Sequence, residues 1–227
     1  MEILGIVPAR AGSKGVPGKN IRLVASRPLI SYSIDAGVKS RLVTKVIVST
    51  DSAEITAVAA RFGAEVPFLR PAALAMDDVP TYDVIRHALE YLRANGYEPD
   101  LVVILQPTSP LRLAQHVDQA LDFLRESDAD SLVSVCRAEH SPYWMRTINE
   151  SGYLQPFVDN SNYSRRQALP PVYRPNGAIY VTSPHLIEKG TLLGERVLPY
   201  VMEPEDSVDI DTELDLAFAE FLLLRQK

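Results

Sequence analysis

The stretch that decides the fold is Leu101-Val102-Val103-Ile104-Leu105-Gln106-Pro107. Its first five residues are apolar without alternation, which is typical of a strand buried on both faces of a parallel sheet. Apolar residues at helical spacing precede it over 84–92 and follow it over 117–124. Other strand-like runs lie between helix-like segments, at 3–7, 45–49, 65–69, 131–135, 178–181 and 196–201. This alternation predicts an α/β fold with a doubly wound, mostly parallel sheet.

Further helix signals set boundaries within this alternation. Asp51 and Glu54 have the spacing of a capping box, so we expect a helix to begin there. Pro28 stands at the start of an apolar pattern that extends to Leu42. The last such pattern, over 214–222, predicts an amphipathic helix near the C-terminus.

The alternation of helix and strand signals is interrupted once along the chain. No linker or internal repeat divides it, so we expect a single domain over 1–227. Over 137–173 the helix and strand signals stop, and aromatic residues are frequent. Two interpretations stay open for this segment: an inserted arm that contacts another protein, or a long surface loop packed on its own side chains.

Composition restricts the class of protein. Apolar residues make up 46% and charged residues 23%, as in an ordinary globular protein. The formal net charge of −6 argues against a general nucleic-acid binder, which usually carries a basic surface. No apolar run approaches the roughly 20 residues of a membrane span. The single cysteine, Cys136, cannot form an internal disulfide, which predicts a cytoplasmic protein.

A glycine-rich, basic loop directly follows the first predicted strand. Within residues 8–20 it carries Gly12, Gly15 and Gly18 together with Arg10, Lys14 and Lys19. Glycines let backbone amides approach an anion closely, and no acidic residue lies between residues 3 and 34. The loop therefore predicts a site for a polyanion, with an ordinary basic surface loop as the alternative. Its glycine spacing fits neither a Walker A loop nor a dinucleotide-binding motif.

A pair of carboxylates lies near the C-terminus. Asp209 and Asp211 are two residues apart, so in an extended segment their side chains point to one face. Such hard oxygen ligands suit Mg²⁺, which completes its coordination with phosphate oxygens and water. The alternative is that Asp211 or Thr212 caps the last helix. For Asp215 we expect capping or surface charge.

With these segments the chain resembles the CMP-sialic acid synthetase (acylneuraminate cytidylyltransferase) family. The resemblance covers essentially the whole chain and rests on five segments in the family's order. They are the glycine-rich loop, Leu69-Arg70-Pro71 with Leu74, Ala75 and Asp78, the run QPTSPLR at 106–112, the stretch from Arg166 to Tyr180 containing YRPNGAIY, and SVDIDTELD at 207–215.

The resemblance implies a role for each candidate residue. Nucleotide binding is expected of Arg10, Ala11, Gly12, Ser13, Lys14, Lys19, Asn20, Arg70 and Thr81. Sugar binding is expected of Gln106, Arg166, Asn176 and Tyr180. Catalysis is expected of Arg10, Lys19 and Asp211, and binding of Mg²⁺, or of Mn²⁺ in its place, is expected of Asp209 and Asp211.

The residues alone leave alternatives open for several of these roles. Gln106 can equally be the end of its strand, Arg70 one half of a surface ion pair, and Thr81 a helix N-cap. Arg165 precedes Arg166, so the choice of sugar contact between them is also open.

The implied protein is a Rossmann-like nucleotidyltransferase and homodimer, with a dimerisation arm inserted over 137–173. The implied reaction transfers a cytidylyl group from CTP to a nine-carbon 2-keto sugar acid such as N-acetylneuraminate, releasing pyrophosphate. Lys19-Asn20 argues against the KDO branch. Leu192-Leu193 stand where sialic acid enzymes often have aromatic residues, which keeps legionaminic acid, pseudaminic acid and KDN as alternatives. From another class, a non-catalytic nucleotide-binding module is the alternative.

Overall fold

A six-stranded sheet forms the centre of the protein, which a computed structural model describes over residues 1–159 and 169–225. Its strands are β1 (Ile3–Pro8), β4 (Lys45–Ser49), β5 (Leu101–Ile104), β6 (Ser131–Arg137), β9 (Tyr173–Thr182) and β10 (Val197–Val201). They lie in the order β10-β6-β9-β5-β1-β4. All neighbours pair in parallel except β9, which runs antiparallel to both β5 and β6. The predicted mostly parallel sheet is therefore confirmed.

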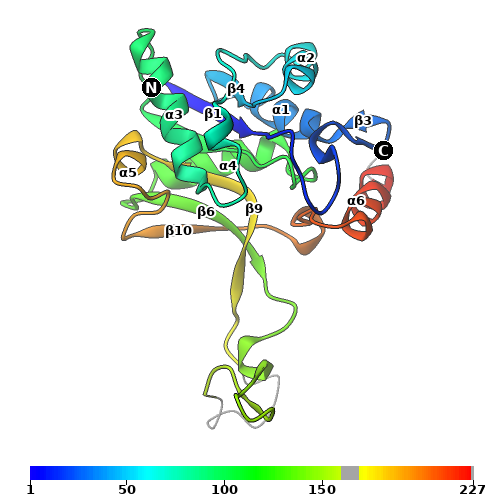
Figure 1. Cartoon of the computed structure of the whole chain (residues 1–227). Coiled ribbons are helices and arrows are strands. Elements are labelled where there is room, and N and C mark those ends of the chain that lie inside the picture. The colour runs from blue at the N-terminus through cyan, green and yellow to red at the C-terminus, as the bar shows by residue number, and fades with distance from the viewer. Residues whose placement is uncertain (160–168, 226–227) are drawn as a thin grey trace.

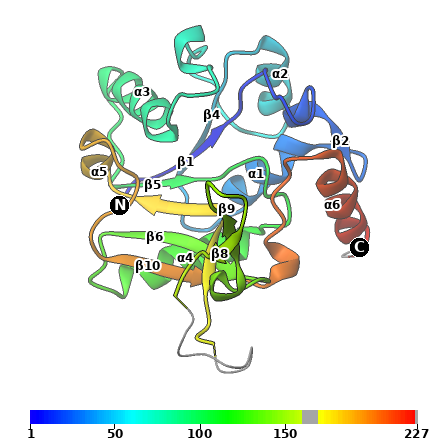
Figure 2. The ribbon, with the colours of Figure 1, turned by 60° about the horizontal axis from the view of Figure 1, so that its bottom comes forward.

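Helices cover both faces of this sheet (Figures 1 and 2). They are α1 (Leu29–Val38), α2 (Ala53–Arg61), α3 (Thr81–Ala94), α4 (Ala114–Arg125), α5 (Pro184–Glu188) and α6 (Glu213–Arg225). One apolar layer contains Ile34 of α1 and Leu121 of α4, and the opposite layer contains Ile85 of α3 and Ile187 of α5. The doubly wound arrangement is thus confirmed. Among the described residues, no helix has both the length and the apolar character to cross a membrane.

Several element boundaries differ from the predicted ones. Ser52, and not Asp51, caps α2, because the Ser52 hydroxyl accepts a backbone hydrogen bond at 3.3 Å from within the first turn. Helix α1 ends at Val38, so Leu42 lies beyond it. The segment 65–69 makes only isolated bridges to its neighbours and is not a full strand.

The last helix is apolar on both sides and not amphipathic as predicted. Its buried residues are Leu216, Ala219 and Leu223, which pack with Val16 and Leu111 in a third apolar cluster. Its other side exposes Leu214, Phe218, Phe221 and Leu224. The buried side matters for the site, because it packs the C-terminal helix against the glycine-rich loop.

A short hairpin completes this corner of the molecule. The 3₁₀ turn η1 (Lys19–Ile21) leads into β2 (Leu23–Val24), which pairs antiparallel with β3 (Arg27–Pro28). The backbone N–H of Ala25, in the hairpin turn, donates to the Glu220 carboxylate of α6 at 2.8 Å. The segment after the glycine-rich loop is therefore fastened to the C-terminal helix.

An arm projects from the body of the protein (Figure 1). Strands β6 and β9 continue beyond the sheet as a two-stranded ribbon, in which Arg137 still pairs with Tyr173. The arm carries the 3₁₀ turn η3 (Pro142–Trp144) and a small antiparallel hairpin of β7 (Arg146–Ile148) and β8 (Leu154–Pro156). Over its described residues the segment extends away from the body rather than folding back on it.

Candidate functional site

The candidate site is a cleft of about 290 Å³ where the parallel strands β1 and β5 end. Its walls come from the loops after these strands, the start of α3, and residues 71–80, which we call the strap and which include the 3₁₀ turn η2 (Ala72–Leu74). Seven of the expected residues line it: Arg10, Ser13, Lys19, Asn20, Arg70, Thr81 and Gln106. Thr81 is the first residue of α3 and Pro80 is its N-cap, so the capping alternative for Thr81 is wrong.

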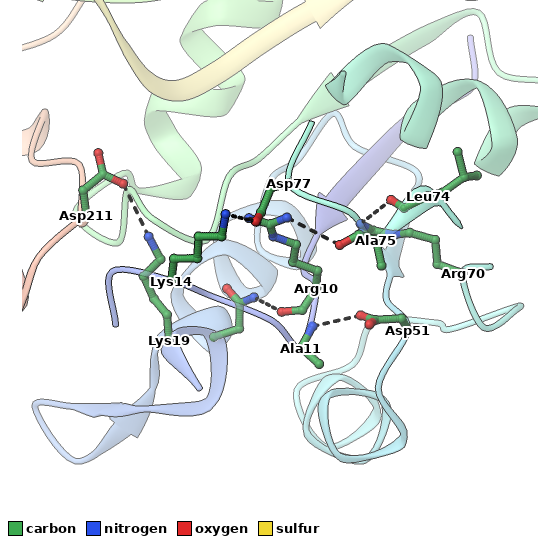
Figure 3. A network of polar contacts seen from close by, with 11 residues as sticks. Arg10, Ala11, Lys14, Lys19, Asp51, Arg70, Leu74, Ala75, Asp77 and Asp211 are labelled. Carbon is green, nitrogen blue, oxygen red and sulfur yellow. Dashed lines mark hydrogen bonds and ion pairs between the residues drawn. The ribbon is translucent and has the colours of Figure 1, made fainter. Parts of the chain in front are cut away.

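Two hydrogen bonds fix the start of the glycine-rich loop. The Asn20 side-chain amide donates to the Arg10 carbonyl at 2.8 Å, and the Asp51 carboxylate accepts from the Ala11 N–H at 2.8 Å (Figure 3). A phosphate contact from the Ala11 amide would therefore have to compete with Asp51. At Gly12 nothing lies within 4 Å of the position that a Cβ would take, so this part of the loop faces open space.

The middle of the loop contacts the acidic segment, 207–211, near the other end of the chain. A Cβ on Gly15 would lie 2.1 Å from the Asp211 carbonyl oxygen, so glycine is required at this close approach. The Lys19 ammonium donates to the Ile210 carbonyl at 2.6 Å and lies 3.5 Å from an Asp211 carboxylate oxygen. Only 12% of the Lys19 side chain is exposed. The structure thus brings the predicted phosphate loop and the predicted metal pair side by side.

Arg70 lies in the wall of the cleft and not on the surface. It is 6% exposed, and its guanidinium donates to the Ser49 hydroxyl at 3.1 Å and, through a second nitrogen, to the Ser49 carbonyl. Burial lowers the pKa of Arg70 to about 10, which leaves it charged at neutral pH. The alternative of a surface ion pair is therefore wrong, and the cleft has a buried positive charge in its wall.

The strap places a carboxylate in the cleft that the sequence reasoning missed. Asp77 lines the cleft and forms ion pairs with Arg10 at 2.5 Å and with Lys14 (Figure 3). The hydrogen bond from Lys14, followed by the contact with Arg10, holds the pKa of Asp77 below its usual range. The signal that could have identified it is the acidic pair Asp77-Asp78 shortly after Arg70, of which the sequence analysis used only Asp78.

The two carboxylates of the predicted metal pair have different surroundings. Asp209 has one buried oxygen without a hydrogen-bond partner among the described residues, and burial raises its pKa. Asp211 is exposed and its carboxylate faces Lys19. Thr212 caps α6, as the alternative for this segment held, because its hydroxyl accepts from the Asp215 N–H at 3.2 Å. Asp215 takes part in this cap, as expected, since its carboxylate accepts in return from the Thr212 N–H and hydroxyl at 2.8 Å each.

These surroundings fit a divalent cation. The unpartnered buried oxygen of Asp209, beside the exposed carboxylate of Asp211, offers hard oxygen ligands for such an ion. In the described ranges no group of three or more His, Cys, Asp or Glu side chains is placed to hold a metal. The pair Asp209 and Asp211 would therefore leave most of the coordination to phosphate oxygens and water.

Asn176 is a structural residue and not a free sugar contact. It is 1% exposed, and its amide oxygen accepts from the Ser134 hydroxyl at 2.6 Å and from the Ala178 N–H at 3.1 Å. Its amide nitrogen donates to the Ser207 hydroxyl at 2.9 Å and to the Met202 sulfur at 3.3 Å. All four hydrogen-bonding positions of the side chain are used within the protein, so a side-chain contact with a sugar would have to replace one of these bonds. Asn176 instead anchors the start of the acidic segment.

The next residue, Gly177, brings Gln106 and Asp209 together. Its φ is +74°, and a Cβ there would lie 3.3 Å from the Gln106 amide oxygen and 3.5 Å from an Asp209 carboxylate oxygen. Arg112, which had no predicted role, donates to the carbonyls of Gln106 at 3.3 Å and Ala178 at 2.8 Å. Arg112 is fully buried, and burial lowers its pKa to about 9. Gln106 therefore does more than end its strand, because its amide faces the turn in β9.

Of the two remaining expected sugar residues, the structure describes only Tyr180. Tyr180 is half-buried on β9 and is not among the residues that line the cleft. Burial raises the pKa of Tyr180, and the negative charge of Asp209 adds to this effect. Arg166 and its neighbour Arg165 fall outside the described residues.

Gly15→Ala should weaken the contact between the glycine-rich loop and the acidic segment. The added Cβ overlaps the Asp211 carbonyl, so one segment must shift, and we expect the free energy of unfolding to fall by about 1–3 kcal/mol. Gly12→Ala is the matched control, because its Cβ enters open space and should change stability by less than about 0.5 kcal/mol. Denaturant titration of both variants measures this. Equal losses would contradict the close approach at Gly15.

Comparison with known proteins places the chain in a family. The cytidylyltransferase family model matches residues 4–221. A CMP-N,N'-diacetyllegionaminic acid synthase from Legionella pneumophila is 38% identical, over 98% of this chain and 97% of its own length. An N-acylneuraminate cytidylyltransferase from Escherichia coli O18:K1:H7 is 35% identical over 100% of this chain, which spans only 52% of that relative.

A solved structure supports the fold. A CMP:2-keto-3-deoxy-manno-octonic acid synthetase complexed with CTP superposes with a TM-score of 0.76 at 16% identity, over 100% of both chains. This likeness confirms the expected Rossmann-like nucleotidyltransferase fold. Since the family model spans nearly the whole chain and relatives exceed 30% identity, the chain belongs to the cytidylyltransferase family, and its resemblance to the CMP-sialic acid synthetases is confirmed.

Proposed function

We propose that the protein transfers a cytidylyl group from CTP to a nine-carbon 2-keto sugar acid, N-acetylneuraminate or a close analogue, and releases pyrophosphate. The observation that carries this proposal is the junction of the basic loop, the Gln106 amide and the carboxylates of Asp209 and Asp211 at one edge of the sheet. The cations can neutralise the charge of a triphosphate, the amide can hydrogen-bond a sugar acid, and the carboxylates can coordinate a metal ion. The relatives named for legionaminic acid and acylneuraminate support the same substrates.

The cations of the cleft suit a triphosphate. Lys19 and Arg10 line it, and Arg70 adds a buried charge in its wall. Lys19 and Arg70 are poorly exposed to water, so their attraction for phosphate is screened less than at an open surface. Because Lys19 is held by the Ile210 carbonyl, its charge is oriented before the nucleotide arrives. Lys19 and Arg10 therefore neutralise charge on the transferred and leaving phosphates.

Asp209 and Asp211 would hold Mg²⁺, or Mn²⁺ in its place. When bound, the metal supplies positive charge that polarises phosphate oxygens and makes a hydroxyl nucleophile easier to deprotonate. Burial disfavours the ionised form of Asp209, and a neighbouring cation removes that penalty. The buried surroundings of Asp209 therefore favour a neighbouring cation.

The arrangement supports a direct displacement without a covalent enzyme intermediate. The anomeric hydroxyl oxygen of the sugar bonds to the α-phosphorus, the bond from that phosphorus to the bridging oxygen breaks, and pyrophosphate leaves. The hydroxyl proton passes to solvent. The chain contributes orientation through Gln106, which faces Gly177, and charge stabilisation through Lys19 and Arg10.

Legionaminic acid is the second candidate acceptor. Leu192 packs against the apolar cluster on the α3 and α5 side of the sheet, and Leu193 lines a separate hollow. Neither leucine lines the cleft, so these two residues do not by themselves select an acyl group. The 38% identity to a diacetyllegionaminic acid synthase supports this candidate.

A substrate panel tests the proposed reaction. With CTP and Mg²⁺, pyrophosphate release should require an added sugar acid and should be fastest with a nine-carbon one, among N-acetylneuraminate, N,N'-diacetyllegionaminate, pseudaminate and KDN. We expect kcat/KM for the best of these to exceed that for KDO by about tenfold or more. Binding of CTP without pyrophosphate release for any acid would instead identify a non-catalytic nucleotide-binding module.

The metal assignment has its own test in the same assay. Asp211→Asn should lower kcat by roughly 10²-fold, because it removes charge from the metal pair and leaves the fold intact. Glu205→Gln is the matched control: Glu205 is exposed on the 3₁₀ turn η5 (Pro204–Asp206), and its loss removes the same charge nearby. Wild-type rates for Asp211→Asn with Mg²⁺ would overturn the assignment.

We also propose that two copies form a homodimer through the arm. The arm exposes a set of apolar side chains, each more than 40% accessible: Trp144, Met145, Ile148, Tyr153, Leu154 and Phe157. Monomeric proteins rarely expose so many apolar groups on one extension, because such a surface is normally covered by a partner. A second copy of the chain offers the same surface, as a two-fold interface requires.

The double variant Ile148→Glu/Leu154→Glu should convert the dimer to a monomer. These residues pair across the β7–β8 hairpin, so two charges would enter the middle of the proposed interface. Light scattering coupled to gel filtration measures the mass. Phe123→Glu is the control, since Phe123 is an exposed apolar residue of α4, away from the arm, and this variant should stay dimeric. A monomeric wild-type protein would remove the proposal.

A further inference from the structure

The strap is held over the cleft almost entirely by cations. Apart from the backbone hydrogen bond from the Asp83 N–H to the Pro80 carbonyl, where the strap joins α3, its polar contacts with the rest of the described chain come from Arg10, Lys14 and Arg70. Two of these are long hydrogen bonds, from Arg10 to the Ala75 carbonyl at 3.4 Å and from Arg70 to the Leu74 carbonyl at 3.5 Å. The remaining contacts are the two ion pairs of Asp77.

Little apolar packing secures the strap. Its 3₁₀ turn η2 has no buried residue, and Met76 is 61% exposed. The position of residues 71–80 therefore depends largely on the two ion pairs of Asp77. Segments with few buried contacts open at low free-energy cost, so the strap can move when its ion pairs are exchanged.

The two partners of Asp77 are two of the cations expected to bind the nucleotide: Arg10 lines the cleft, and Lys14 is an exposed residue beside it. Arg10 and Lys14 converge on one carboxylate, which lies where an anion of the substrate would bind them (Figure 3). Without an anion, the two like charges would repel each other. The Asp77 carboxylate therefore holds the two cations close together and, at the same time, takes up the positions at which they would bind another anion.

We propose that Asp77 is an internal stand-in for a phosphate group of the nucleotide, which the triphosphate of CTP must displace from Arg10 and Lys14. This inference rests on the proposed function, since it takes CTP as the ligand of the cleft. Asp77 then sets the affinity for CTP: binding exchanges one carboxylate for phosphate oxygens, and the strap is released from the two cations. The ion pairs are partly exposed and hence individually weak, which makes the exchange feasible.

The test is direct binding of CTP, measured by calorimetry at low salt without sugar acid. Asp77→Asn keeps the size of the side chain but removes the competing charge, so CTP should bind about threefold to tenfold more tightly than to the wild type. Asp78→Asn is the matched control, because Asp78 is an adjacent exposed carboxylate with no ion pair among the described residues. It makes the same change in net charge and should leave affinity within about twofold.

Each outcome decides the inference. Tighter binding by Asp77→Asn alone supports displacement, and the gain should shrink as salt rises. Unchanged or weaker binding by Asp77→Asn, with an unchanged melting temperature, overturns it and makes Asp77 a residue that only positions Arg10 and Lys14. An equal gain for Asp78→Asn also overturns it, since net charge alone would explain the effect. Failure of the wild-type protein to bind CTP contradicts the proposed function itself.

A second measurement follows the strap. Amide hydrogen exchange over residues 71–80 should quicken, relative to the rest of the chain, when CTP takes the two cations from Asp77. In Asp77→Asn the exchange should already be fast without nucleotide and change little on binding. Slower exchange on binding to the wild type would contradict release of the strap.

Discussion

The site depends on the close contact between Gly15 and the Asp211 carbonyl, which brings the glycine-rich loop and the acidic segment against each other. The glycine-rich loop has few side chains that pack, and the acidic segment brings two like charges close together. Each is stabilised by the other, and the bond from Lys19 to the Ile210 carbonyl adds a charged donor to the junction. Because of this contact, the cations and carboxylates proposed to bind the triphosphate and its metal are adjacent before any ligand arrives.

The antiparallel strand β9 makes that junction possible. Asn176, at its bend, joins Ser134 of β6 to Ser207 at the start of the acidic segment. Gly177 then leaves room for Gln106 and Asp209 to approach each other. Arg112 donates to the Gln106 carbonyl, just beyond β5, and to the Ala178 carbonyl within β9, so it holds these two backbone segments together. Because β9 runs antiparallel, its first half lies at the edge of the sheet where β5 and β6 end, which places Asn176 and Gly177 beside the cleft.

The sequence predicted the sheet and the helices well because buried elements leave recognisable apolar patterns, either continuous runs or residues at helical spacing. The unbroken apolar run of β5 is the strongest example. Local rules failed where a distant partner decided the outcome: Asp51 has the sequence position of a helix cap, yet it binds the Ala11 N–H across the site. The same reason explains Asn176, since a buried amide and a ligand-binding amide look alike in sequence. Asp77 was missed because its partners are far away along the chain.

The separation between loop and acidic segment has a consequence for a chain that is still being made. Lys19 and Asp211 are 192 residues apart. At about 5–20 residues per second, the second leaves the ribosome roughly 10–40 s after the first. All six strands of the sheet end by Val201, before the acidic segment begins. A nascent chain of that length can therefore acquire the sheet while it lacks the carboxylates, so the proposed metal pair is added only after the last strand of the sheet has been translated.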